Sequence, residues 1–124
     1  MRELKDYFCT PEQSQKLKEL GLNEDVLAIS VGSTIRVVPM NYKPHPVEVE
    51  MPLRAQALGY FREKGYETKI EKYEKGYGYE IEVKESNGLI IYLQGDFTPY
   101  YVSESMLIDR LIEMELDKEV EDGN

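Results

Sequence analysis

Closely spaced carboxylates are the residues of this sequence best suited to chemistry. Glu48 and Glu50 stand two positions apart, as do Glu80 and Glu82, so each pair would share one face of a strand. Together with Asp96, the first pair could bind a cation or a small ligand, or serve in acid–base catalysis. No Asp-x-Asp-x-Asp-Gly loop and no glycine-rich phosphate loop accompanies these acids. Acids at alternate positions are also typical of the solvent-facing side of a sheet. We favour this interpretation, in which the paired acids are exposed and have no chemical role.

The single histidine and the single cysteine add little that could support catalysis. His45 lies between Pro44 and Pro46, which predict a loop, and no partner for a general base stands near it. Cys9 precedes a predicted helix, whose N-terminus could lower the thiol pKa. Without a second cysteine we expect it instead to pack as a small apolar side chain. We therefore expect no metal and no other cofactor, and an enzyme is the less favoured hypothesis.

Ten tyrosines are the unusual feature of the composition, and eight of them lie between Tyr60 and Tyr101. Alternation places Tyr66, Tyr77 and Tyr79 on the inner face of a predicted sheet, where core packing explains them. Four others are harder to bury together: Tyr73, Tyr92, Tyr100 and Tyr101. Tyrosine is favoured at protein interfaces because it combines rigid apolar area with a hydroxyl group. These four form the candidate interaction surface, although they could instead cover a sheet edge and the loop before the last helix.

The elements that must position these residues begin with a well-marked helix. Thr10 can cap a helix that starts at Pro11, and Gln13 stands where it completes a capping box. Gly21 offers the left-handed conformation that commonly ends a helix. The sequence therefore predicts a short helix between these two signals.

Further strands and helices are predicted along the rest of the chain. In order, they are strands at Val26–Val31 and Thr34–Met40, a helix at Pro52–Lys64, strands at Tyr66–Tyr73, Tyr77–Lys84 and Leu89–Gln94, and a last helix capped by Ser103. Turns at 32–33, 75–76 and 87–88 join neighbouring strands. In the middle helix, Arg54 lies outside the apolar stripe. The residues from about 118 to 124 are predicted to form a frayed acidic tail.

The predicted order is α-β-β-α-β-β-β-α, an α+β fold with helices on one face of an antiparallel sheet. A length of 124 residues suits a single domain covering 1–124. The C-terminal part, α-β-β-β-α, resembles a double-stranded-RNA-binding domain in element order. That family binds phosphates with a lysine-rich start of its last helix, whereas the corresponding residues here are Ser103 to Met106, with Glu104 among them. We therefore expect no binding of double-stranded RNA.

The negative charge of the chain is concentrated at its end. The formal net charge is -9, and residues 103–124 contribute eight acids and two bases to it. Such a balance argues against a general affinity for nucleic acid or for anionic membranes. The longest apolar run, Leu89–Leu93, has the length of a strand and not of a membrane span. With no apolar leader near Met1, a cytoplasmic protein is expected.

One segment of the sequence resembles a known group of proteins. Residues 9–21 read CTPEQSQKLKELG, similar to the opening of small uncharacterised proteins from phages, prophages and mobile elements of gut bacteria. The resemblance extends loosely to Ala55–Lys64, to the tyrosine-rich segment and to Leu107–Glu113. It implies a bacterial, phage-related origin and carries over no catalytic residue, because that group has no assigned activity.

These observations favour a non-catalytic phage or mobile-element protein that acts through protein–protein interaction. The acidic last helix and the tyrosines indicate a host protein with a basic surface as the partner. Two alternatives stay open: a cation- or ligand-binding protein or enzyme using Glu48, Glu50 and Asp96, and an acidic mimic of DNA. Homodimerisation through a sheet edge or the last helix is compatible with the sequence.

Overall fold

A computed structural model of the chain describes residues 3–32, 34–39, 42–84, 89–97 and 99–122, of which residues 89, 91–97 and 119–122 are described by their backbone alone. The elements are η1 (Leu4–Tyr7), α1 (Pro11–Leu20), β1 (Ala28–Val31), β2 (Thr34–Val37), β3 (Val49–Met51), α2 (Arg54–Glu63), β4 (Tyr66–Tyr73), β5 (Gly76–Val83), β6 (Leu89–Phe97) and α3 (Tyr100–Asp122). The α+β class and the order of the main elements are confirmed. The 3₁₀ helix η1 is an addition that the sequence pattern did not predict. The short strand β3 lies where the first carboxylate pair was expected on a strand, and it includes Glu50 but not Glu48.

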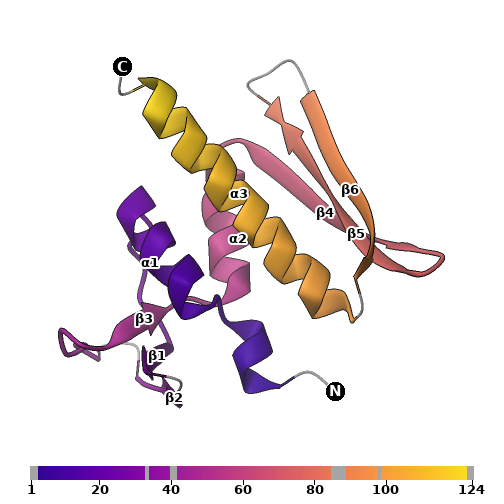
Figure 1. Cartoon of the computed structure of the whole chain (residues 1–124). Helices are drawn as coiled ribbons and strands as arrows, with labels where there is room; N and C mark the ends of the chain where they lie inside the picture. The colour runs from indigo at the N-terminus through magenta and orange to yellow at the C-terminus, as the bar shows by residue number, and fades with distance from the viewer. Residues whose placement is uncertain (1–2, 33, 40–41, 85–88, 98, 123–124) are drawn as a thin grey trace.

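The strands are divided between two antiparallel sheets. The N-terminal sheet has the order β2-β1-β3 and the C-terminal sheet the order β4-β5-β6. α3 crosses the middle of the molecule, where it packs on α1, on α2 and on the C-terminal sheet (Figure 1). α1 also contacts β3, so it links the N-terminal sheet to the helical layer. The helices thus lie between two small sheets and do not cover a single large one.

The ends of α1 are formed by the residues that the sequence indicates. Thr10 Oγ1 accepts a hydrogen bond from Gln13 N at 3.1 Å, and Gln13 Oε1 accepts one from Thr10 N at 2.9 Å. At the other end Gly21 has a φ of 114°, and Leu22 N donates to Leu17 O at 2.9 Å. Both the capping box and the Schellman-type end are therefore confirmed.

The C-terminal sheet has one buried face. Alternation along β4 and β5 puts Tyr66, Tyr79 and Ile81 in the main core, where they meet Phe61 of α2 and Leu111 of α3. β6 pairs regularly with β5 up to Tyr79↔Leu93, and the register then shifts before Tyr77↔Phe97. The predicted strand alternation is confirmed here, because one face of the sheet is covered by helices and the other is not.

α3 differs from the prediction at its start. The helix begins at Tyr100 and not after Ser103, so the predicted cap is wrong. Pro99 precedes the helix and its carbonyl accepts a hydrogen bond from Val102 N at 3.0 Å, which closes the first turn upstream of the expected position. Ser103 is fully buried on the inner side of α3, and its hydroxyl has no hydrogen-bond partner among the described residues.

The C-terminal end of α3 also extends beyond the predicted helix. The backbone is helical through Asp122, over most of the segment predicted to fray. In the part of the chain that the structure describes, no helix is both long and apolar enough to cross a membrane.

Candidate functional site

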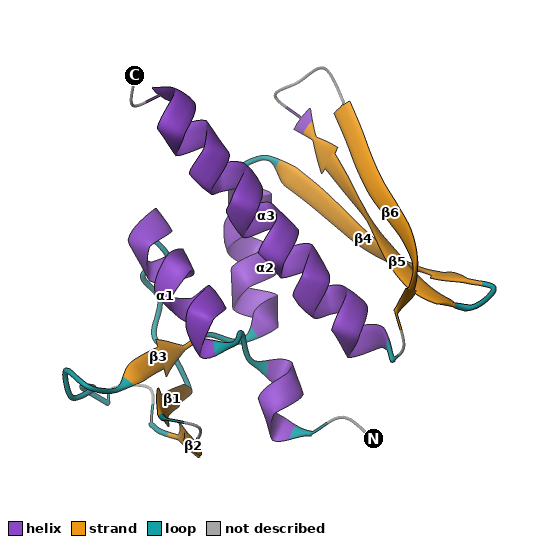
Figure 2. Cartoon of the chain, in the orientation of Figure 1, coloured by secondary structure: helices purple, strands orange, loops and turns teal. Residues whose placement is uncertain are grey.

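The C-terminal sheet leaves one of its faces open, and we call its side chains the open face. They are Glu67, Lys69, Glu71, Tyr73, Glu80, Glu82 and Ile90. Cross-strand pairing puts Glu67 opposite Glu82, and Glu82 opposite Ile90, on the side away from the core. Figure 2 shows α2 and α3 on one side of this sheet and no helix of the described chain on the other. Ile90 is accordingly 48% exposed, although it is a large apolar residue.

The open face is acidic even after its ion pairs are formed. Lys84 Nζ lies 2.9 Å from Glu67 Oε1, and Lys69 Nζ lies 2.7 Å from Glu71 Oε1. Hydrogen bonds from these lysines lower the pKa of Glu67 and of Glu71 below the usual glutamate value. Glu80 and Glu82, by contrast, form no ion pair among the described residues. Two carboxylates therefore remain available to a cationic ligand or partner.

Tyr73 and Tyr100, two of the four candidate tyrosines, lie on opposite sides of the C-terminal sheet. Tyr73 lies on the open face, where its hydroxyl donates to Glu71 Oε2 at 3.2 Å. Tyr100 lies at the start of α3, on the helical side of the sheet, and is 41% exposed. Tyr101 follows it and is half-buried. Tyr92 pairs through its backbone with Glu80, and its side chain lies outside the described residues.

Tyr77 lies on the inner face of the sheet, as the alternation predicts, but at its margin, where it is only half-buried. Its ring packs edge-on against that of Tyr100, with ring centroids 5.5 Å apart and an angle of 85° between the planes. Both rings are partly exposed, so the pair lies at the boundary between the core and the surface. The contact depends on where α3 begins, and strand periodicity carries no information about that.

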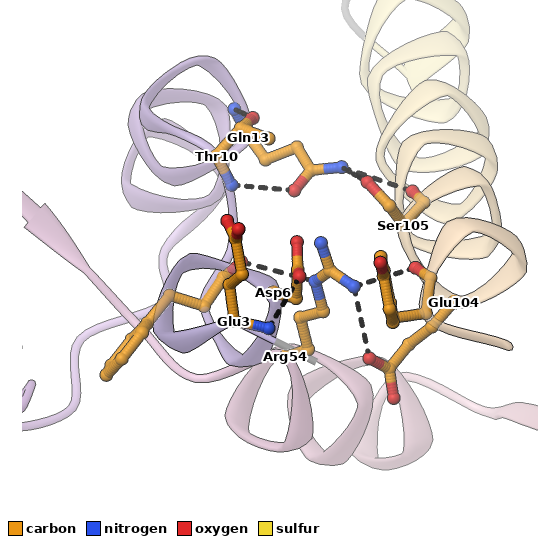
Figure 3. A network of polar contacts seen from close by, with 9 residues as sticks. Glu3, Asp6, Thr10, Gln13, Arg54, Glu104 and Ser105 are labelled. Atoms are coloured by element: carbon orange, nitrogen blue, oxygen red, sulfur yellow. Dashed lines mark hydrogen bonds and ion pairs between the residues drawn. The ribbon is translucent and has the colours of Figure 1, made fainter. Parts of the chain in front are cut away.

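A buried arginine joins three distant segments at the base of the helical layer. Arg54 is only 5% exposed; its Nε donates to Phe8 O at 3.2 Å, and its Nη1 donates to Tyr101 O at 2.7 Å and to Glu104 Oε1 at 3.3 Å. Figure 3 shows this side chain between η1, α2 and α3. Its position outside the apolar stripe suggested a surface residue, whereas the guanidinium is buried and paired. Because Nε and Nη1 donate to acceptors within the chain and the side chain is buried, we assign it a structural role.

Cys9 lies beside this arginine and is also fully buried. Burial raises the pKa of its thiol to about 12, an effect that the nearby Arg54 opposes only in part. A cavity of 300 Å³ next to it is lined by Asp6, Ile35 and Met51, among other residues. The thiol is therefore protonated at neutral pH, which does not suit a nucleophile.

The structure places Asp96 apart from the other two predicted cation ligands, Glu48 and Glu50, which line one hollow. Glu48 lies before β3, and its carboxylate accepts hydrogen bonds from Tyr42 Oη at 2.8 Å and from the exposed His45 backbone N at 2.6 Å. Glu50 lies on β3 and pairs with Lys18 Nζ at 3.4 Å. Asp96 lies on β6, in the other sheet, and its side chain is outside the described residues.

No cluster suited to a metal ion is found in the described part of the chain. None of its His, Cys, Asp and Glu residues form a group of three or more that could hold one. A depression of 580 Å³ lies between α2 and the segment after α1, and its lining includes Glu24, Gly59, Tyr60 and Arg62. No His, Cys, Ser or Thr is among its described lining residues. The residues that line this depression therefore indicate no particular reaction.

Comparison with known proteins gives no family for this chain. No protein-family model matches it, and no match was found among curated proteins or among solved structures. The resemblance of residues 9–21 to phage and mobile-element proteins therefore stays a prediction.

Proposed function

We propose that this protein is a non-catalytic binding module that docks a partner protein with a basic surface on the open face of the C-terminal sheet. One observation carries the proposal. One face of this sheet is covered by α2 and α3, while the other presents, beside an exposed apolar residue, two carboxylates that form no close ion pair within the described part of the chain. Charged groups around an apolar contact are typical of transient protein interfaces. In the phage-related setting that the opening motif suggests, the partner would be a host protein in the bacterial cytoplasm.

The chemistry of the open face supports a basic protein over other ligands. Glu80 and Glu82 would attract lysine and arginine side chains and would repel phosphate groups. Ile90 and Tyr73 add apolar area that a protein surface can cover and that a small ion cannot use. The proposal thus combines the charge and the aromatic residue of one face, and it does not require Tyr100 or Tyr101.

Affinity capture from bacterial lysate, with quantitative mass spectrometry, tests the proposal. A variant carrying Glu80→Gln and Glu82→Gln should lose at least one basic protein that the unchanged protein retains. The unchanged protein should also release that partner as salt is raised, because ionic attraction between exposed groups is screened. Ile90→Ser should weaken retention without changing the charge.

A matched control removes the same number of charges elsewhere. Glu12→Gln with Glu19→Gln changes two exposed acids of α1 and should leave retention unchanged. Equal losses in the two double variants would mean that the overall charge, and not the open face, is recognised. Retention unaffected by changes at Glu80, Glu82 and Ile90 would refute the proposal.

A further inference from the structure

The two edges of the C-terminal sheet differ in how well they are protected from pairing with another strand. β4, at one edge, carries charged residues along its length, including Glu67, Lys69 and Glu71. β6, at the other edge, has no charged residue from Leu89 to Gly95. Charged side chains on an edge strand are a common means of preventing edge-to-edge association. β4 has this protection, and the first part of β6 does not.

The regular part of β6 is also the uncharged part. Pairing with β5 is continuous from Val83↔Leu89 to Tyr79↔Leu93. Beyond Leu93 the register shifts, so that residues 94–96 stand opposite Gly78 alone. Irregularities of this kind bend a strand and end regular pairing. Among the described strands, β6 pairs with β5 alone, so its other edge over 89–93 is regular in backbone and carries no charged residue.

We propose that this edge pairs with the same edge of a second copy of the chain, in antiparallel orientation, so that the two C-terminal sheets become continuous. The sequence of 89–93 suits a two-fold axis at Ile91, since Leu89 would then stand opposite Leu93, and Ile90 opposite Tyr92. Every pair in this arrangement is apolar, and a two-fold interface requires such self-complementarity.

The charge distribution favours a second copy over a basic protein at this edge. The chain carries a net charge of -9, so two copies repel each other over most of their surfaces. At 89–93 no charge of one copy would face a charge of the other. A basic partner, in contrast, would find no carboxylate on this segment to pair with. The dimer uses the backbone edge of β6 and requires neither Glu80 nor Glu82 of the central strand β5, so the Glu80→Gln and Glu82→Gln variant separates the two proposals; Ile90 belongs both to this edge and to the open face.

The size of the edge sets the expected strength of the dimer. Stable interfaces bury about 1,600 Å² in total, and pairing along so short a ladder buries less. The dimer should therefore be weak and its population should rise with protein concentration. Sedimentation velocity, from low micromolar to near-millimolar protein, should show a reversible shift from monomer to dimer.

Two lysine substitutions locate the interface. Ile90→Lys adds a charge to the proposed edge at a residue that is 48% exposed, and it should keep the protein monomeric over the whole range. Val37→Lys is the matched control, because Val37 is 63% exposed on β2, the edge strand of the other sheet. This control should dimerise like the unchanged protein. Thermal unfolding of both variants verifies that they are folded.

Hydrogen exchange at low and high concentration gives an independent readout. Amides of 89–93 should become more protected as the unchanged protein is concentrated, while those of β4 should not change. A protein that stays monomeric throughout, or a dimer that survives Ile90→Lys, would overturn the proposal. Protection appearing on α3 or β4 in place of β6 would overturn it as well.

Discussion

At the scale of single residues, burial decides what the reactive groups of this protein can do. Cys9 stands just before a helix, a position that often activates a thiol, yet it is fully buried and its backbone N donates to Pro52 O at 2.9 Å. Loss of solvation outweighs the favourable charge of Arg54, and the pKa rises from 9.0 to about 12. The environment of the side chain therefore reverses the effect expected from its position in the sequence.

Alkylation of Cys9 tests this directly. With a pKa near 12 in place of 9.0, the thiolate fraction at pH 8 falls by about a thousandfold, and burial further limits access of the reagent. We expect iodoacetamide to modify the native protein very slowly and the protein unfolded in guanidinium at the ordinary rate, as followed by mass spectrometry. Rapid modification of the folded protein at pH 8 would contradict the buried, protonated state.

At the scale of elements, one glutamine couples a helix cap to helix packing. Gln13 is 3% exposed and completes the capping box of α1 through Oε1. Its Nε2 donates across to α3, to Ser105 O at 3.1 Å (Figure 3). It also donates to Asp109 Oδ1 at 2.8 Å. A residue that the sequence marks only as a local cap thus also holds α1 against α3.

Substitution of Gln13 separates the two roles. Gln13→Ala removes both and should lower the free energy of unfolding by about 2–3 kcal/mol. Gln13→Glu keeps the acceptor for Thr10 N but places a carboxylate beside Asp109, so it should also destabilise, and Asp109→Asn should restore part of the loss. Chemical denaturation measures these differences.

The neighbouring Gln15 supplies the control for this series. It is exposed on the same helix, and Gln15→Ala should change stability little. If Asp109→Asn did not improve the Gln13→Glu protein, the contact between α1 and α3 would contribute little to stability.

At the scale of the whole molecule, two sheets at opposite ends of the helical layer have different surroundings. The C-terminal sheet supplies most of the strand residues of the main core, while the N-terminal sheet packs a smaller cluster around Phe8, Ala28 and Met51. The charged side chains of the open face are accessible to solvent, so the protonation of their ion-paired groups changes with pH. The acid stability of the molecule should therefore depend on groups that take no part in its core.

The pKa values of Glu67 and Glu71 set the sign of this pH dependence. Both are lowered from 4.5 by hydrogen bonds from lysines, so their contribution to stability is present above pH 4.5 and is lost as pH falls through the lower folded values. The pKa values of Lys69 and Lys84 are raised from 10.5, so the lysine contribution is present below pH 10.5 and is lost at higher pH.

Thermal unfolding between pH 7 and pH 3 tests this expectation. The unchanged protein should have a slightly higher Tm than a variant with Glu67→Gln and Glu71→Gln at pH 7, because exposed ion pairs contribute little. The difference should shrink as pH falls below 4.5 and through the lowered folded pKa values of Glu67 and Glu71, because the protonated carboxyls are then uncharged like the amides of the variant. A difference that is constant across this range would show that these ion pairs do not contribute through their charge.

Signals between near neighbours in the sequence account for the secondary structure of this protein. The ends of α1, the strands β4 and β5 and the helix α2 follow from signals a few residues long, such as the Thr10–Gln13 box and the glycines at 21 and 65. The α+β class follows from the order of these elements, and the acidic end of the chain is visible in composition alone. Each of these features depends on interactions between near neighbours, which periodicity and capping rules describe.

Which side chains are buried, which strands pair and on which face a residue lies depend on the tertiary structure. Arg54 is buried because the carbonyls of Phe8 and Tyr101, 46 and 47 residues away, accept its hydrogen bonds. The strands form two sheets because β1 pairs with β3, which follows a loop, and not with a strand of the β4-β5-β6 sheet. The candidate tyrosines separate likewise, since the face on which each lies depends on strand register and on the start of α3. Contacts between segments distant in the sequence set these outcomes, and no local pattern encodes them.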